Sequence, residues 1–127
     1  MRWNIDSERP VYIQLIEQIQ AGIISGYFKP SDKLPSVRDL AAQVGVNPNT
    51  MQRALSELER TGLIYTNRTS GRYITSDIEI IKKLKAESAN NIVMDFLDNM
   101  RKLGFEEEET LEITRKIVEE MKEWIRY

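Results

Sequence analysis

Two short amphipathic segments joined by a turn constrain the fold of this chain more than any other feature. The first segment begins at Ser36, a favourable N-cap, and Gly45 ends it. The second begins at Asn47, another favourable N-cap, with Pro48 at the first helical position, and Gly62 ends it. Apolar side chains recur at three- and four-residue steps in both segments. Residues 36–61 are therefore predicted to form a helix, a tight turn and a second helix.

The flanking residues extend this pattern. Residues 1–9 are interpreted as an extended arm, and residues 10–25 carry an apolar stripe that predicts a helix with Pro10 in its first turn. Residues 63–66 and 73–75 are β-branched or aromatic runs around a polar loop, which predicts a hairpin. Three helices followed by a hairpin are the order of elements in a winged helix-turn-helix.

From residue 77 onward the pattern is helical alone. Apolar residues at three- and four-residue steps predict one long helix over 77–103, with Asn90-Asn91 as a weak point, and Gly104 breaks it. Four glutamates at 106–109 then open a second helix, where its dipole favours carboxylates. The predicted fold is mainly α with a small β-hairpin, divided into a winged helix-turn-helix over 1–76 and a two-helix tail over 77–127.

Composition excludes several chemistries. The 127 residues include no Cys and no His, which rules out disulfides, Cys or His nucleophiles and zinc sites of the usual Cys/His kind. We expect no metal and no cofactor, and the sequence does not identify a small-molecule effector. There is no signal-peptide pattern and no apolar run near the ~20 residues that span a bilayer. A cytoplasmic location without membrane contact is therefore expected.

The net charge of −2 conceals an asymmetry between the two predicted parts. Residues 1–76 hold nine Lys and Arg against seven Asp and Glu, a net charge of +2. Residues 77–127 hold nine against thirteen, a net charge of −4. This difference indicates that the two parts have different roles.

Polar side chains crowd the start of the predicted helix 47–61. Asn and Gln can pair bidentately with adenine and Arg with guanine, while a helix N-terminus offers backbone N–H groups to phosphate. The loop at 67–72 adds arginines, hydroxyls and a glycine that permits close approach. The candidate DNA-binding residues are Ser36, Arg38, Asn47, Asn49, Thr50, Gln52, Arg53, Arg68, Thr69, Gly71 and Arg72.

These residues also have ordinary structural interpretations. Asn47 can serve only as a helix cap, and Thr50 can complete the capped turn. Arg53, Arg68 and Arg72 can be solvated surface charges. The order of the surrounding elements is what favours DNA.

Five motifs follow one another along the first half of the chain: Pro10-x-Tyr12-x-Gln14, Leu34-Pro35-Ser36-x-Arg38-x-Leu40-Ala41, Asn47-x-Asn49-Thr50, Arg53-Ala54-Leu55 and Gly62-Leu63-Ile64. With these motifs, about half of the chain resembles the DNA-binding domain of the GntR family of bacterial transcription regulators. The resemblance implies a sequence-specific DNA-binding transcription regulator. Residues 47–61 would be its major-groove recognition helix and residues 67–72 its wing. It also implies operator contacts by Arg38, by the polar residues from Asn47 to Arg53, and by Arg68, Thr69 and Gly71.

Three positions depart from the family pattern. The first wing glycine is replaced by Thr69, Pro48 stands where an Arg or Ser is frequent, and Gln52 stands where a basic residue is frequent. Fewer phosphate contacts would make operator binding less sensitive to salt.

The short tail resembles the YtrA-like subfamily, whose tail mainly dimerises. Genes of this subfamily commonly lie beside transporter genes, so the resemblance implies a dimeric repressor of a transporter operon. Such a repressor would be associated with the bacterial nucleoid when it is bound to DNA.

The tail's own residues also predict a dimer. Two helices cannot cover all of the tail's apolar side chains, and an exposed apolar patch usually marks an interface. The predicted dimerisation residues are Phe96, Met100, Leu103, Val118, Met121 and Trp124. A two-fold dimer would set two recognition helices about one DNA turn apart, on a pseudo-palindromic double-stranded operator. In the alternative, the tail folds back on its own domain. An effector pocket could also form where the tail helices meet, lined by Phe96, Met100, Met121 or Trp124, although core packing is the commoner role of such residues.

Two other classes of function remain open. A winged helix can bind proteins, but the polar first turns of 47–61 favour DNA over a protein partner. Carboxylates 106–109 could suggest an enzyme, but residues one apart splay around a helix. We therefore expect no catalytic residues.

Overall fold

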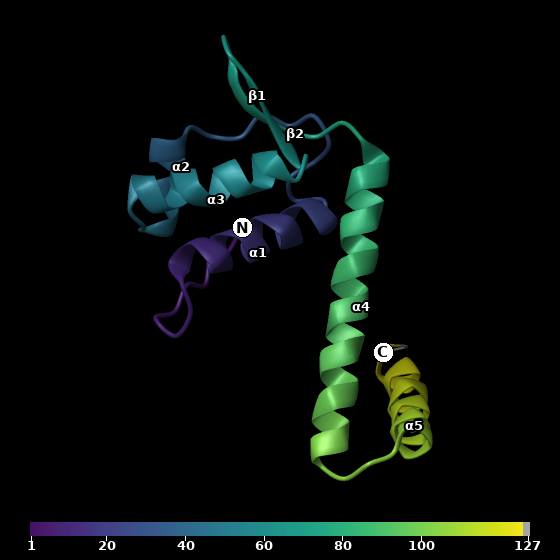
Figure 1. Ribbon diagram of the computed structural model, residues 1–127. Helices are drawn as coiled ribbons and strands as arrows, with labels where there is room; N and C mark the ends of the chain where they lie inside the picture. The colour runs from purple at the N-terminus through teal and green to yellow at the C-terminus, as the bar shows by residue number, and fades with distance from the viewer. Residues whose placement is uncertain (126–127) are drawn as a thin grey trace. The chain divides into compact units, whose positions relative to one another are not determined.

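The computed structural model describes residues 1–125 (Figure 1). Its elements, in chain order, are α1 (Val11–Ile24), α2 (Val37–Val44), α3 (Pro48–Arg60), β1 (Ile64–Asn67), β2 (Gly71–Ile74), α4 (Ile78–Lys102) and α5 (Glu107–Ile125). The predicted winged helix-turn-helix followed by C-terminal helices is confirmed. Among the described residues, no helix is long and apolar enough to cross a membrane.

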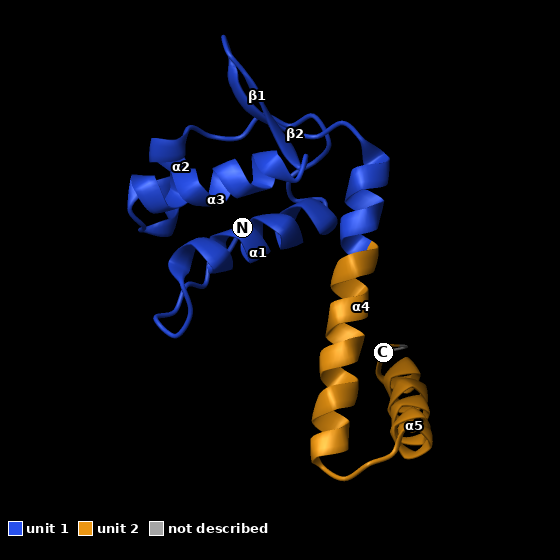
Figure 2. Cartoon of the chain, in the orientation of Figure 1, with its two compact units in different colours: residues 1–85 blue, residues 86–127 orange. Residues whose placement is uncertain are grey.

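The chain divides into two compact units, residues 1–85 and the residues from 86 onward (Figure 2). The division falls within α4, so the first turns of α4 belong to the first unit. There Ile80, Ile81 and Leu84 are partly buried against the core of the winged helix.

The helix boundaries of the first unit follow from local chemistry. At the start of α2 the Ser36 hydroxyl accepts a hydrogen bond from the Asp39 N–H at 3.1 Å, and at the start of α3 the Asn47 side-chain oxygen accepts one from the Asn49 N–H at 2.7 Å. Both predicted caps are confirmed. Gly45 ends α2 in the left-handed conformation, with φ at 83°. The expected place of Pro10 is wrong by one position: its ψ of 132° is extended, so it caps α1 from outside the first turn.

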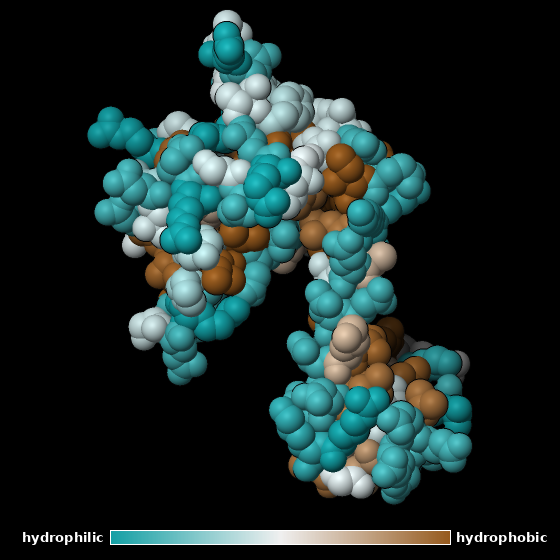
Figure 3. Space-filling model, in the orientation of Figure 1, coloured by the Kyte–Doolittle hydropathy of each residue, from teal (hydrophilic) through white to brown (hydrophobic). Residues whose placement is uncertain are grey.

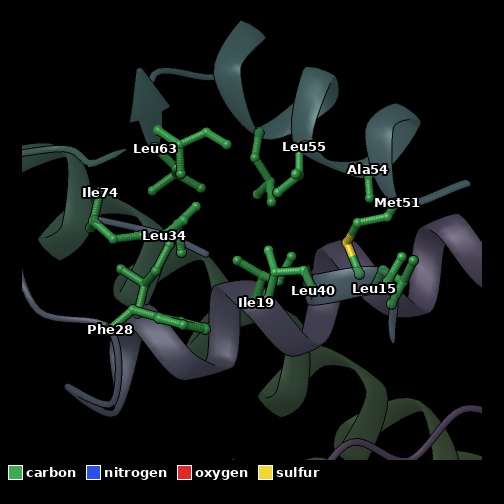
Figure 4. Close-up of a cluster of buried hydrophobic side chains, with 14 residues drawn as sticks. Leu15, Ile19, Phe28, Leu34, Leu40, Met51, Ala54, Leu55, Leu63 and Ile74 are labelled. Carbon is green, nitrogen blue, oxygen red and sulfur yellow. The ribbon is translucent and has the colours of Figure 1, made fainter. Parts of the chain in front are cut away.

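The core of the first unit lies where α3 packs against α1 and α2 (Figure 4). Its central side chains are almost fully buried and come from all three helices: Leu15, Ile19, Leu40, Met51, Ala54, Leu55 and Leu58. The antiparallel pair β1–β2 closes one end, with Ile64 paired to Ile74 and both buried. The backbone at Leu34 pairs with β2, since the Leu34 N–H donates a hydrogen bond to the Arg72 carbonyl at 2.9 Å. The core thus holds the wing beside the helix pair.

The N-terminal arm is docked along α1 by two glutamine side chains. Gln14, only 2% exposed, accepts a hydrogen bond from the Asp6 N–H at 2.9 Å. Its amide group donates to the carbonyls of Asp6 and Arg9 at 2.9 and 2.8 Å. One turn later Gln18 forms two such bonds with the backbone of Asn4. These bonds to the backbone of Asn4, Asp6 and Arg9 fix the path of the arm along α1.

The second unit leaves its apolar residues open to solvent. Within residues 86–125 Thr110 is the only buried residue, whereas large apolar side chains are exposed on α4 and α5 (Figure 3). The predicted long helix over 77–103 is confirmed, because α4 runs from Ile78 to Lys102 and continues through Asn90-Asn91. Gly104 then takes a φ of 94° in the turn before α5.

Candidate nucleic-acid interface

The face of α3 that points away from the core carries the predicted reading residues. Met51, Ala54, Leu55 and Leu58 form the buried stripe. At about 100° per residue, positions 49, 53 and 56 lie on the opposite side of the helix. Asn49, Gln52 and Arg53 are exposed, and Thr50 is half-buried. The side chains named for DNA contact therefore share one accessible helical surface.

The N-termini of α2 and α3 both carry exposed caps. Ser36 and Asn47 each use a side-chain oxygen to accept a backbone N–H, so the structural interpretation of Asn47 as a cap is confirmed. The remaining first-turn N–H groups have no partner within their helix, as at any helix start. Such N–H groups are suited to a phosphate oxygen. Arg38 is exposed in the first turn of α2.

Ser56 and Tyr12, which were not among the candidate DNA-binding residues, each contact a side chain of the reading surface. The Gln52 amide group donates to the Ser56 hydroxyl at 3.2 Å, which holds the amide along α3. The Arg53 guanidinium carbon lies 3.6 Å from the centroid of the Tyr12 ring on α1. In the sequence, Tyr12 widens the apolar stripe of the first helix and belongs to the Pro10-x-Tyr12-x-Gln14 motif, but neither signal shows that Arg53 stacks on it.

The wing tip is braced by Asn67. The Asn67 side-chain oxygen accepts hydrogen bonds from the Thr69 N–H at 3.1 Å and from the Thr69 hydroxyl at 2.9 Å. A glycine at position 69 would lack the second of these bonds, so the departure from the family pattern stiffens the tip. Gly71 has a φ of 115°, which disfavours any other residue. Arg68 and Thr69 are exposed at the tip.

Arg72 differs from its neighbours in the wing. Its Nε atom lies 3.7 Å from an oxygen of Glu59 on α3, and the two side chains are 20% and 30% exposed. These two atoms are buried and have no hydrogen-bond partner. Arg72 therefore faces the recognition helix, in contrast to Arg68.

An open groove separates the wing from the start of α2. It brings together residues from three segments: Lys33, Ser36, Val37, Asp39, Thr66, Ser70, Gly71 and Arg72. Two basic groups, one carboxylate and several hydroxyls thus line a hollow beside an exposed helix N-terminus. This arrangement suits a phosphate backbone that passes between helix and wing.

The predicted dimerisation residues lie in the second unit. Met100 is half-buried, and the other five are exposed, from Phe96 at 39% to Leu103 at 72%.

The glutamates at 106–109 support the start of α5. Glu107 forms an ion pair with Arg101 at 2.8 Å. A hydrogen bond from its own backbone N–H, together with Arg101, lowers the pKa of Glu107. Within residues 1–125 there is no group of three or more carboxylates placed to hold a metal ion.

A polar, exposed recognition helix beside a braced wing defines a winged helix-turn-helix protein of the DNA-binding class. Residues 11–74 match the sequence model described as "Bacterial regulatory proteins, gntR family". The chain therefore belongs to the GntR family, and it is a DNA-binding transcription regulator rather than an enzyme.

Relatives of known sequence agree with this membership. The uncharacterized HTH-type transcriptional regulator YhcF of Bacillus subtilis is 40% identical over 109 residues, which cover 86% of this chain and 90% of YhcF. The HTH-type transcriptional repressor YtrA of the same organism is 48% identical over 71 residues. That match covers 56% of this chain and 55% of YtrA, so the similarity extends over about half of each protein.

Solved structures share the fold. A GntR family transcriptional regulator from Listeria monocytogenes superimposes with a TM-score of 0.82 at 39% identity, covering 88% of this chain and 98% of that one. AraR(DBD) in complex with operator ORE1 superimposes with a TM-score of 0.51 at 30% identity, covering 59% of this chain and 94% of that one.

Proposed function

We propose that this regulator is a homodimeric repressor that binds a pseudo-palindromic operator and controls a transporter operon. Residues 1–76 read the DNA, and residues 77–127 form the dimer. The observation that carries the proposal is the exposed polar face of α3 between a capped N-terminus and a braced wing. The relative YtrA is named a repressor, and AraR(DBD) is described in complex with an operator.

The proposed contacts divide by position. Asn49, Thr50 and Gln52 lie in the first turns of α3, which enter the major groove in this class of fold. Arg38 and the helix starts at Ser36 and Asn47 bind phosphates, while Arg68, Thr69 and Gly71 contact the flanking DNA from the wing. Arg53 and Arg72 are also part of this surface, although each is held by another residue of the protein.

The dimer rests on the exposed apolar side chains of the second unit. Leu103 and Trp124 are 72% and 69% exposed, and Phe96, Val118 and Met121 are 39–45% exposed. Leaving so many large apolar groups in water is unfavourable, and monomeric proteins rarely expose contiguous patches of that kind. A second copy of the same two helices would cover them and would match the two-fold symmetry of an operator.

DNA binding is tested by a mobility shift with the region upstream of the chain's own gene. As a phosphate contact, Arg38→Ala is expected to weaken binding to operator and to unrelated DNA by a similar factor, and to lower the slope of log affinity against log salt by about 0.9. Because Arg38 is exposed, the melting temperature is expected to stay nearly unchanged. Arg115→Ala, which removes an exposed arginine of α5, is the matched control. Equal affinity of the Arg38 variant and the control would remove Arg38 from the interface, and no salt-sensitive shift of the unaltered dimer would overturn the proposed function.

Dimerisation is tested by sedimentation at micromolar concentration. Trp124→Ala is expected to lower the sedimentation coefficient toward that of a monomer, whereas Tyr27→Ala, an exposed aromatic of the first unit, is expected to leave it unchanged. If Trp124→Ala sediments like the unaltered chain, the tail residue is not in the interface. A monomeric unaltered chain would favour the tail folding back on its own domain.

The regulatory role is tested by deleting the gene. A repressor of a neighbouring transporter operon predicts higher transcript levels of that operon in the deletion strain. Lower levels would indicate an activator, and unchanged levels would exclude that operon as the target.

A further inference from the structure

The Arg53 side chain stacks on an aromatic ring at the reading surface. Its guanidinium carbon lies 3.6 Å from the centroid of the Tyr12 ring, well within the distance at which an arginine and an aromatic face attract. Tyr12 is half-buried in the first turn of α1, so the ring itself is a fixed platform. The stack therefore joins two helices at the edge of the face expected to meet DNA.

The nearest carboxylate, Glu57, interacts with the charge of Arg53 but forms its ion pair with Arg60. Glu57, one turn further along α3, is bound by Arg60 through hydrogen bonds of 2.9 and 3.1 Å. The hydrogen bond and charge of Arg60 lower the pKa of Glu57, so this carboxylate stays ionised and engaged. Arg53 takes part in none of the salt bridges within residues 1–125. Its guanidinium thus rests on an uncharged ring, forms no ion pair within residues 1–125 and remains able to donate hydrogen bonds to a DNA phosphate.

The position of the platform selects the part of the DNA that Arg53 can reach. Positions 49 and 56 lie within about 60° of position 53 around α3, on its outward side. Tyr12, however, belongs to α1 and draws the guanidinium toward the flank of α3. A helix inserted in the major groove has base edges in front of it and sugar–phosphate backbones along its flanks. An arginine on the flank therefore faces a phosphate.

We propose that Tyr12 is a positioning residue for operator binding, and that the Arg53 it holds contacts a DNA phosphate rather than a base. This proposal rests on the proposed function. Stacking occupies one face of the guanidinium and leaves N–H groups at its edge free to donate. Because the side chain is already ordered, binding does not lose its rotamer entropy at that moment.

The magnitude follows from that entropy. Ordering one flexible side chain at an interface opposes binding by an amount that corresponds to about a 2- to 12-fold change in affinity. Tyr12→Leu is therefore expected to weaken operator binding by that factor. Tyr12→Phe retains the ring and is expected to bind within about 2-fold of the unaltered chain, since the stack requires the π face. Arg53→Lys keeps the charge but loses the planar group, and is expected to behave like Tyr12→Leu.

The experiment uses the full chain and measures affinity over a range of salt concentrations. The probes are an operator from the upstream region and a DNA of unrelated sequence. A phosphate contact predicts that Arg53→Ala lowers the slope of log affinity against log salt by about 0.9 and weakens both DNAs by a similar factor. In the free protein, the side-chain protons of Arg53 are expected to show a ring-current shift that Tyr12→Leu abolishes and Tyr12→Phe keeps.

Three results would overturn the inference. Tyr12→Leu could weaken binding equally in an Arg53→Ala background, which would show that Tyr12 acts by another route. Tyr12→Leu could leave affinity unchanged while Arg53→Ala lowers it, which would show that positioning is unimportant. Arg53→Ala could lose affinity only for the operator, which would make Arg53 a base-reading residue. Failure of the unaltered chain to bind operator is a separate outcome, and it would refute the proposed function itself.

Discussion

The contact between Arg72 of the wing and Glu59 of the recognition helix supports a prediction about stability and DNA binding together. The two groups approach to 3.7 Å, and their side chains are 20% and 30% exposed. At this distance two unit charges attract by roughly 4 kcal/mol at an effective dielectric constant of about 20. Partial exposure screens the attraction and burial has a desolvation cost, so the net coupling is expected to be about 1–2 kcal/mol.

The perturbation is a double-mutant cycle of Arg72→Met and Glu59→Leu. Each single change leaves the opposite charge partly buried without a counter-charge, and is expected to lower the free energy of unfolding by about 1–2 kcal/mol. The double change replaces both groups by apolar side chains of similar volume. It is expected to cost less than the two single changes combined, because the Arg72 Nε and Glu59 oxygen atoms already lack hydrogen-bond partners.

Urea denaturation at one fixed protomer concentration measures the cycle, because dimerisation makes apparent stability depend on concentration. Additive effects within about 0.3–0.5 kcal/mol would refute the reasoning, since they would mean that the two side chains do not interact.

The same variants test the role of Arg72 in DNA binding. If Arg72 acts only by orienting the wing, Arg72→Met leaves the salt slope of operator binding unchanged. A slope lowered by about 0.9 would show that Arg72 contacts a phosphate.

Three further predictions concern the scaffold. Gln14→Leu removes three hydrogen bonds to the arm and is expected to lower the free energy of unfolding, measured by urea denaturation, by about 1–3 kcal/mol. Gln18→Ala removes the exposed hydrogen bonds to Asn4 and is expected to lower it by less than about 1 kcal/mol. Gly45→Ala adds a Cβ in open space at a φ of 83°, so backbone strain is expected to lower the free energy of unfolding by about 1 kcal/mol. Gly45→Asn is expected to lower it less, because Asn tolerates the left-handed conformation. Equal losses for the two variants would contradict backbone strain as the cause. The pKa of Glu107 is lowered in the folded state, so its stabilisation is complete above the ordinary pKa of a glutamate and is lost as pH falls through the lower folded value. Melting curves across this acidic range should therefore show a smaller pH dependence for Glu107→Gln, and an unchanged dependence would contradict the sign.

Local chemistry made much of the first unit predictable from the sequence. The caps at Ser36 and Asn47, the stop at Gly45 and the hairpin around Gly71 all depend on residues within a few positions of one another. Their outcomes agree with the prediction because a cap or a left-handed turn is decided by nearby backbone and side-chain geometry. Periodicity made α4 predictable as well, because apolar residues at three- and four-residue steps continue through Asn90-Asn91 to the break at Gly104.

The candidate site was predictable only in part. The sequence identified which polar residues would stand at the start of α3, because helical periodicity places them opposite the apolar stripe. It could not show that Arg53 rests on Tyr12 or that Arg72 faces Glu59. Both contacts join side chains more than ten positions apart, and no motif encodes the angle at which helices and strands cross.

By itself, therefore, the sequence determined the order of elements, the helix boundaries and the polar character of the reading surface, since these arise from short-range interactions and from hydrophobic periodicity. Only the tertiary structure decided which of the basic side chains remain free at the tip and which are held by the protein. That decision depends on packing: α3 against α1 brings Tyr12 under Arg53, and the wing against α3 brings Arg72 to Glu59. Arg38 and Arg68 remain exposed because no other element packs over them.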